Sequence, residues 1–291
     1  MKLVSFIRDD GAIRTGVVAG DRVLDLHAMD ATLPADMCAL LAGGQDSLDR
    51  IGALLGTAGD APRGTSLPLE GVRLACPVQR PEKILGIGLN YKDHCREMGS
   101  ELPTTMRVFA MFANGLVGHR DAIELPKTSS KMDYEAELVV VIGKNTRYVS
   151  EDDALDHVAG FTIGNDISAR DHQADDPLTM RGKCGDTHAP AGPWIVTRDE
   201  LPDPSRLDIE LKLNGRVMQS SNTEELIFTV PHIVSFLSRY YTLRPGDLIF
   251  TGTPPGVGSG RDPQVWLQPG DQMDVSIEGI GTLSNTCVAE A

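Results

Sequence analysis

The most apolar strand-like run in the chain, Leu138–Ile142, is preceded by two acidic residues, Glu135 and Glu137. Successive side chains of a strand point to opposite faces, so residues two apart share a face. A second apolar run, Val158–Gly164, is followed closely by Asp166. The pattern predicts two strands that present three carboxylates, two of them from one strand face.

Like charges side by side repel, so a cation between these carboxylates would make the arrangement favourable. The set contains no Cys and no nearby His, and oxygen ligands suit Mg²⁺, Mn²⁺ or Ca²⁺. In the alternative interpretation, Glu135 and Glu137 line the solvent face of a half-buried strand and Asp166 caps a turn. The spacing alone leaves both interpretations open.

Residues 1–75 predict a small N-terminal unit. Apolar runs separated by turn residues predict three strands, Lys2–Arg8, Arg14–Val18 and Arg22–Leu26. Helical segments are expected around Met37–Leu41 and Ser47–Leu55, and residues 59–69, rich in Gly, Pro, Ala and Ser, predict a surface linker. Residues 76–291 would then form a second domain.

The second domain begins with a strand at Lys83–Gly88, after which Asn90 is expected to cap a helix that ends at Gly99. His94 and Glu97 are three residues apart, which places them on one helix face, as a base and its orienting carboxylate require. Surface pairs with this spacing are abundant, and the residues alone favour that plainer interpretation.

Turn-rich connections dominate the remainder. Asn214-Gly215 predicts a two-residue hairpin, and Thr229 predicts the start of a helix. Residues 174–183 are expected to form a loop without regular structure that returns Lys183 towards the carboxylates. Many strands and few helices indicate a mainly β fold.

Composition narrows the possible partners and compartments. The 41 acidic and 27 basic residues give a formal charge of -14, which disfavours nucleic acid and anionic membranes. The five cysteines are odd in number and lack CxxC spacing, so neither disulfides nor a zinc site is indicated. The apolar segment at the N-terminus is too short for a signal peptide, so we expect a cytoplasmic protein.

Five short motifs occur in an order that resembles the fumarylacetoacetate hydrolase family over about residues 80–290. They are YEAEL at 134–138, NDISARDHQ at 165–173, GK at 182–183, TGTP at 251–254 and GVG at 256–258. Each motif is weak, but their joint order is specific. The resemblance implies an α+β, mainly β fold. In it, a small N-terminal α/β unit is followed along the chain by a mixed β-sandwich roll formed by residues 76–291.

The resemblance also implies roles for individual residues. Glu135, Glu137 and Asp166 would hold Mg²⁺ or Mn²⁺, with Ca²⁺ possible, and His94 with Glu97 would form a dyad on a mobile lid. Lys183 would be catalytic, while Arg170, Gln173 and Thr253 would bind the substrate. Met111 departs from the family, many of whose members have lysine there, which leaves the substrate open. Family members commonly pair their roll domains, so a homodimer is expected.

The activity implied is a metal-dependent hydrolase that cleaves a carbon–carbon bond in an acylpyruvate-like 2,4-diketo acid, such as fumarylpyruvate, in aromatic catabolism. Decarboxylation of oxaloacetate, isomerisation, hydration and hydrolysis of a diketo sugar acid are alternatives on the same site. A keto-acid binding protein without turnover is a further alternative from another class.

Overall fold

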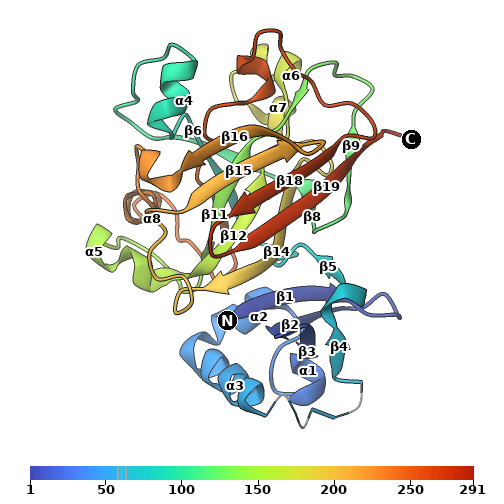
Figure 1. The fold of residues 1–291 in the computed structure, drawn as a ribbon. Coiled ribbons are helices and arrows are strands. Elements are labelled where there is room, and N and C mark those ends of the chain that lie inside the picture. The colour runs from blue at the N-terminus through green and yellow to red at the C-terminus, as the bar shows by residue number, and fades with distance from the viewer. Residues whose placement is uncertain (58, 60, 63) are drawn as a thin grey trace.

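The computed structural model describes residues 1–57, 59, 61–62 and 64–291, and its strands form two sheets and one short pair (Figure 1). Within these residues, the larger sheet has twelve strands in the order β4-β3-β2-β1-β14-β12-β11-β17-β6-β7, with β5 paired to β1 and β8 to β14. Its strands are β1 (Lys2–Ile7), β2 (Ile13–Ala19), β3 (Arg22–Asp25), β4 (Ser66–Pro68), β5 (Arg73–Ala75), β6 (Ile84–Gly88), β7 (Arg107–Met111), β8 (Leu116–Val117), β11 (Ala136–Ile142), β12 (Val158–Asn165), β14 (Ala189–Thr197) and β17 (Leu248–Phe250).

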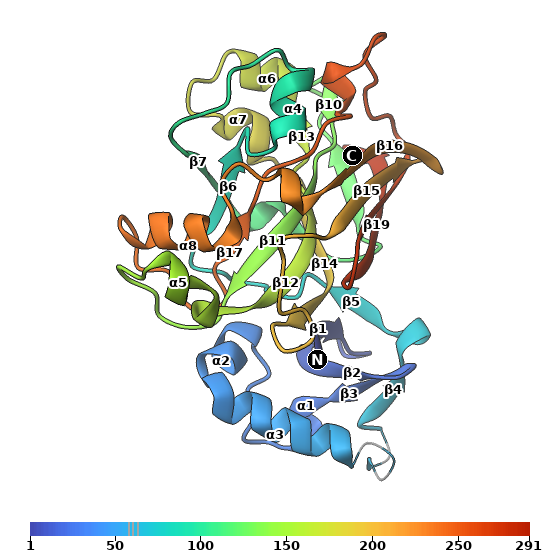
Figure 2. The same ribbon diagram turned by 60° about the vertical axis from the view of Figure 1, so that its left-hand side comes forward.

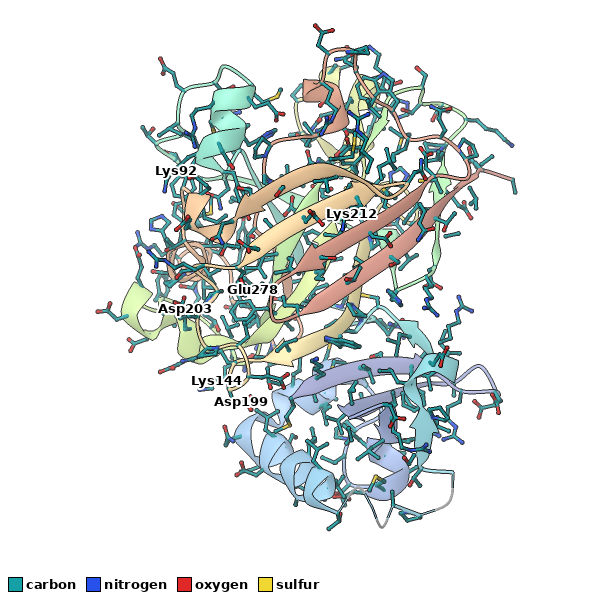
Figure 3. The ribbon with its side chains drawn as sticks, viewed as in Figure 1. Lys92, Lys144, Asp199, Asp203, Lys212 and Glu278 are labelled. Carbon is teal, nitrogen blue, oxygen red and sulfur yellow. The ribbon has the colours of Figure 1, made fainter. Side chains whose placement is uncertain are left out.

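The smaller sheet has five strands within the described ranges, in the order β16-β15-β18-β19-β9. They are β9 (Ala122–Leu125), β15 (Asp208–Leu213), β16 (Arg216–Asn222), β18 (Gln272–Ile277) and β19 (Gly281–Ala289), and a separate pair joins β10 (Met132–Asp133) to β13 (Ser168–Ala169). Inward and outward side chains alternate along β15, where Leu211 is buried and Lys212 points outward (Figure 3). A sheet with one solvated face shows this alternation.

The helices are short and lie around the sheets (Figure 2). They are α1 (Leu26–Met29), α2 (Met37–Ala42), α3 (Gly44–Gly56), α4 (Lys92–Glu97), α5 (Glu151–Ala154), α6 (Arg170–Ala174), α7 (Met180–Lys183) and α8 (Val230–Ser238). Single 3₁₀ turns occur at Leu69–Gly71, Ala113–Gly115, Leu155–His157, Thr223–Glu225 and Gly258–Gly260. No helix in the described part of the chain is long and apolar enough to cross a membrane.

Strand β11 is buried on both faces, which explains its uninterrupted apolar sequence. Leu138, Val140 and Ile142 belong to one apolar cluster, together with residues of the smaller sheet and α8. Val139 and Val141 belong to a second cluster, which includes residues of α2 and α3. The side chains at the start of β11, Glu137 among them, are therefore attached to a strand that is buried on both faces.

The mainly β, α+β fold expected from the sequence is confirmed. The hairpin at Asn214-Gly215 joins β15 to β16, with φ of 51° and 78° at its two residues, as a type I′ turn requires. Thr229 caps α8, since its side chain accepts from the amide of His232. The first strand of the N-terminal unit pairs with both β2 and β14, so the larger sheet extends from one part of the chain into the other.

Three local predictions are wrong. Asn90 does not cap α4, because its side chain bonds the backbone of Phe228 and Thr251 instead. Residues 174–183 include a regular element, α7. In the expected linker, residues 60 and 63 lie outside the described residues, while Ser66–Pro68 forms β4 and pairs with β3.

Candidate active site

Three buried carboxylates meet at one end of β11 and β12. Glu137 lies in β11 opposite Gly164 of β12, Glu135 immediately precedes β11, and Asp166 immediately follows β12. The strands are antiparallel, so the start of one lies beside the end of the other. The exposed fractions of Glu135, Glu137 and Asp166 are 7%, 2% and 0%, which excludes the interpretation that these acids line a solvated strand face.

The three carboxylates fit a hard divalent cation. One oxygen from each of Glu135, Glu137 and Asp166 lies within 4.8 Å of the others. Oδ1 of Asp166 is buried and has no hydrogen-bond partner among the described residues. A buried polar atom without a partner is costly, and a cation would satisfy it. Oxygen donors of this kind suit Mg²⁺, Mn²⁺ or Ca²⁺.

Two basic side chains share the cluster. Nζ of Lys183 donates to Oε2 of Glu135 and to Oδ2 of Asp166, each at 2.6 Å. Arg170 donates from Nη2 to Oε1 of Glu135 at 2.6 Å and from Nε to Oδ2 of Asp133 at 2.9 Å. With Glu137, four buried carboxylates share the cluster with these two cations, so the cluster carries two excess negative charges when all four are ionised. A divalent cation has the charge that balances them.

The carboxylates differ in their proton affinity. Burial raises the pKa of Glu137 well above its ordinary value, and the charges of Asp166 and Glu135 raise it further. Burial also raises the pKa of Asp166, to about 7, although Lys183 opposes the shift. Burial acts in the same direction on Glu135, but Lys183 and Arg170 outweigh it and lower the pKa to about 2. A bound cation would therefore displace protons from Glu137 and Asp166.

The loop after β17 closes one side of the cluster. The amide of Gly252 donates to Oε2 of Glu137 at 2.7 Å. Gly252 has φ of 103°, and a Cβ there would lie 2.8 Å from Cβ of Asn90, so the position requires glycine. The next residue, Thr253, is 5% exposed, and its hydroxyl accepts from Nε2 of Gln219 at 2.8 Å.

The His94–Glu97 pair lies on α4. Nδ1 of His94 and Oε2 of Glu97 are 2.9 Å apart, and Oε1 of Glu97 accepts from the amide of Gly256 at 2.8 Å. The side chain of His94 is 8% exposed, and its one hydrogen bond among the described residues is made by Nδ1, which leaves Nε2 without a partner there. In the tautomer that carries its proton on Nδ1, the Nδ1–H group donates a hydrogen bond to the carboxylate of Glu97. Nε2 is then free to accept a proton. The pair can therefore act as an oriented base.

Most of these groups share one cavity of about 890 Å³. Its lining includes Glu135, Glu137, Asp166, Lys183, Arg170, Gln173, Thr253 and His94, but neither Asp133 nor Glu97. Gln173 is held through Oε1, which accepts from Nη1 of Arg170 at 3.0 Å. Both ribbon views place α4, α6 and α7, which contribute to the lining, at the end of the molecule far from the N-terminal unit (Figures 1 and 2). Met111 points elsewhere, into the second apolar cluster, where it is 4% exposed.

Asp133 is a member of the site that the sequence analysis did not select. It is fully buried, and its Oδ1 accepts from the amide of Gly258 at 2.6 Å, while Oδ2 accepts from the amide of Ser259 at 3.1 Å. Asp133 thus ties the loop after β17 to Arg170. The signal was available, because Asp133 continues the two-residue spacing of Glu135 and Glu137.

The β roll and its buried acidic cluster are the features expected of the fumarylacetoacetate hydrolase family of enzymes. The chain belongs to the fumarylacetoacetate hydrolase family, since residues 83–288 match the family described as fumarylacetoacetate (FAA) hydrolase C-terminal. It is 42% identical to a mitochondrial oxaloacetate tautomerase of Bos taurus over 271 residues, covering 92% of this chain and 85% of the relative.

Two solved structures show the same fold over the full length of both chains. Maleylpyruvate hydrolase from Sphingobium, in complex with manganese(II) and pyruvate, is 31% identical with a TM-score of 0.83. A 5-carboxymethyl-2-hydroxymuconate delta-isomerase from Mycobacterium smegmatis is 32% identical with a TM-score of 0.78. The resemblance stated from the motifs is therefore confirmed at the level of family and fold.

One expectation from the sequence is wrong. A cytoplasmic location is contradicted by the relatives, because the oxaloacetate tautomerases of Bos taurus, Homo sapiens and Xenopus laevis are mitochondrial proteins. That expectation rested on the cysteine pattern and on the lack of a long apolar N-terminal segment. Reduced cysteines do not distinguish the cytoplasm from the mitochondrion.

Proposed function

We propose that this protein is a tautomerase that moves a proton between carbon and oxygen of a 2-keto acid, with oxaloacetate as the first substrate to test. The observation that carries the proposal is the convergence, in one cavity, of a carboxylate cluster short of positive charge and an oriented imidazole with a free nitrogen. The name of the bovine relative, an oxaloacetate tautomerase, supports the choice of reaction.

We infer that Glu135, Glu137 and Asp166 hold Mg²⁺ or Mn²⁺. When bound, such an ion would supply Lewis-acid stabilisation of the negative charge that develops on the keto oxygen of the substrate. Lys183 and Arg170 keep Glu135 ionised and correctly placed, because both donate to its carboxylate. The manganese and pyruvate in the Sphingobium hydrolase support this choice of ion and of substrate class.

His94 is the proton carrier in this scheme. Nε2 removes a proton from the carbon next to the ketone, and Glu97 stabilises the imidazolium through Nδ1. The imidazolium then returns a proton to the keto oxygen, so the substrate leaves as the enol with no net change in atoms. The reverse sequence converts enol to ketone. Gly256 holds Glu97 in place through its amide.

A second candidate is hydrolysis of a carbon–carbon bond in an acylpyruvate-like acid. The same His94–Glu97 pair favours it, because an oriented base also activates water for attack on a distal carbonyl. The structurally similar maleylpyruvate hydrolase from Sphingobium also supports hydrolysis as a candidate reaction. The two reactions share the enol or enolate of a 2-keto acid, so they differ in whether water is admitted and which bond breaks.

The test compares both reactions with Mn²⁺, with Mg²⁺ and with chelator. The loss of the ultraviolet absorbance of enol-oxaloacetate measures tautomerisation, and pyruvate release from acetylpyruvate or fumarylpyruvate measures hydrolysis. Metal-dependent acceleration of enol loss above the spontaneous rate supports the tautomerase. Pyruvate release without such acceleration would replace it by the hydrolase, and activity that survives chelation would contradict the metal role.

A further inference from the structure

Gln219 is a buried polar side chain that the proposed chemistry does not use. It lies on β16 and is fully buried, and it does not line the cavity. Burying a side-chain amide is costly unless its oxygen and both of its N–H groups find partners. The position of Gln219 in the interior therefore calls for an account of each of its hydrogen bonds.

A β-bulge turns Gln219 towards the interior. The pairing of β15 with β16 shifts by one residue after Val217, so that Met218 is an extra residue and Gln219 lies opposite Leu211. Leu211 is buried. Without the bulge, Met218 would lie opposite Leu211 and Gln219 would point to the outer face of the smaller sheet. Nη2 of Arg261 donates to the carbonyl of Met218, which holds the bulge in place.

The amide of Gln219 bridges two segments of the carboxylate end. The bond from the amide of Thr251 to the carbonyl of Leu138 is the last backbone bond in that direction between β11 and the segment after β17, within the described residues. Beyond it, Oε1 of Gln219 accepts from the amide of Ala136 at 2.9 Å, and Nε2 donates to the carbonyl of Pro254 at 2.8 Å. The side chain therefore takes the place of a peptide group where the ladder ends.

These two bonds fix the orientation of the Gln219 amide. A backbone N–H can only donate and a backbone carbonyl can only accept, so the oxygen faces Ala136 and the nitrogen faces Pro254. Exchanging the oxygen and the nitrogen would leave both backbone groups without partners. The other N–H of Nε2 therefore donates to Oγ1 of Thr253, at 2.8 Å.

The direction of the Thr253 hydroxyl follows from this orientation. Oγ1 of Thr253 accepts from Gln219, and this is its one side-chain hydrogen bond in the part of the chain that the structure describes. A hydroxyl carries a single hydrogen, which must point away from the N–H that it accepts. Thr253 lines the cavity, so this hydrogen is available to an acceptor oxygen there.

We propose that Gln219 is a positioning residue, which makes the hydroxyl of Thr253 a hydrogen-bond donor to an oxygen of the ligand in the cavity. The inference rests on the proposed function, since it takes a 2-keto acid as that ligand. It gives Gln219 no contact with the ligand. Its contribution is to orient the donor before the ligand arrives, so that binding does not have to reorganise it.

The test is a double-mutant cycle read by binding, with pyruvate as the probe and calorimetry on the Mn²⁺-loaded protein. Gln219→Met keeps the length of the side chain and removes its donors and acceptor, and it should weaken pyruvate binding about three- to tenfold. Thr253→Val removes the hydroxyl at nearly constant shape and should weaken it ~10-fold or more. In the Thr253→Val background, Gln219→Met should change pyruvate affinity less than about twofold, because the hydroxyl it acts on is gone.

The melting temperature reports the structural part of the role. Gln219→Met leaves the backbone groups of Ala136 and Pro254 without partners, so it should lower the melting temperature equally in both backgrounds. Asn285→Leu is the matched control. Asn285 is a buried amide that donates to the carbonyls of Gly118 and Asp121 and does not line the cavity. It should lower the melting temperature without changing pyruvate affinity.

A second variant serves if Gln219→Met does not fold. Gln219→Glu keeps an acceptor for the amide of Ala136 and replaces Nε2 by an oxygen, which would draw the hydrogen of Thr253 away from the cavity. Its loss of pyruvate affinity should be larger beside Thr253 than in the Thr253→Val background.

The outcomes separate this proposal from the proposed function. If the changes at Gln219 weaken pyruvate binding equally in both backgrounds, or leave it unchanged beside Thr253, the assignment of Gln219 is wrong while the 2-keto-acid site stands. If pyruvate does not bind the Mn²⁺-loaded wild type, the 2-keto-acid site itself is wrong and the assignment of Gln219 falls with it.

Discussion

The two ends of the cavity are built on different kinds of structure. The carboxylate end sits on β11 and β12, in the interior of the larger sheet, where β11 is buried along its whole length. The base end sits on α4, a helix of six residues followed by an exposed segment at residues 98–102. So short a helix has little stability of its own and depends on its packing.

This difference suggests a division of labour. Paired strands with buried faces hold like charges close together and keep them in place before any ligand arrives. We expect a short helix held by a few bonds, such as the one from the amide of Gly256 to Glu97, to move away from the cavity and return. Metal affinity should therefore depend on the strand end, and the rate of proton transfer on the helix end.

The largest effect is expected at the strand end. Glu137→Ala should abolish measurable Mn²⁺ binding in calorimetry and leave a folded protein, because the change removes a ligand and also relieves carboxylate repulsion. Glu278→Ala, at an exposed position in the turn between β18 and β19 (Figure 3), should bind Mn²⁺ as wild type does. Undiminished Mn²⁺ affinity in Glu137→Ala would remove Glu137 from the ligand set.

The next largest effect is expected at the helix end. His94→Ala should lower kcat by ~10²–10⁴, the usual size of a general-base contribution, while Mn²⁺ affinity stays unchanged. His232→Ala is a matched control, because His232 of α8 and Glu151 of α5 form a pair with the same 2.9 Å separation outside the cavity lining. Full activity together with lost metal in His94→Ala would place His94 among the metal ligands.

A third change tests whether the two ends are joined through Asp133, which bonds both Arg170 and the loop after β17. Asp133→Asn should weaken Mn²⁺ binding by ~10–100-fold, as the loss of a group that supports the ligands typically does. Asp171→Asn is the control, since the Asp171 carboxylate also binds a loop, through Ser129 and Ser130, but makes no bond to Arg170 among the described residues. A lower melting temperature with unchanged Mn²⁺ affinity would make Asp133 a purely structural residue.

The smallest effect is expected from pH. Asp166 has an ordinary pKa of 3.8 and a pKa of about 7 in the folded protein, so between these values the folded state binds more protons than the unfolded state. The stability of the metal-free protein should therefore fall as pH rises from about 4 to about 7, by a few degrees in melting temperature. Asp166→Asn should make the profile less steep, since the raised pKa of Glu137 still gives a slope of the same sign, and saturating Mn²⁺ should reverse it. A flat profile for metal-free wild type would contradict the raised pKa.

The sequence alone determined the acidic cluster and the His94–Glu97 pair as candidates. Both signals are local, because a strand repeats every two residues and a helix brings positions three apart to one face. Motif order over most of the chain added the family, which the match to residues 83–288 confirms. The same local rules failed at Asn90, whose side chain was taken up by Phe228 and Thr251 from distant parts of the chain.

Only the tertiary structure decided which side chains contact the carboxylates and the His94–Glu97 pair. Lys183 and Asp166 are 17 residues apart, and Lys183 and Glu135 are 48 apart, so no local period could pair them. Asp133 and Gly258, which bond each other beside the cluster, are 125 residues apart. Burial, charge balance and access to a cavity depend on contacts between remote segments, and such contacts form only when the chain packs.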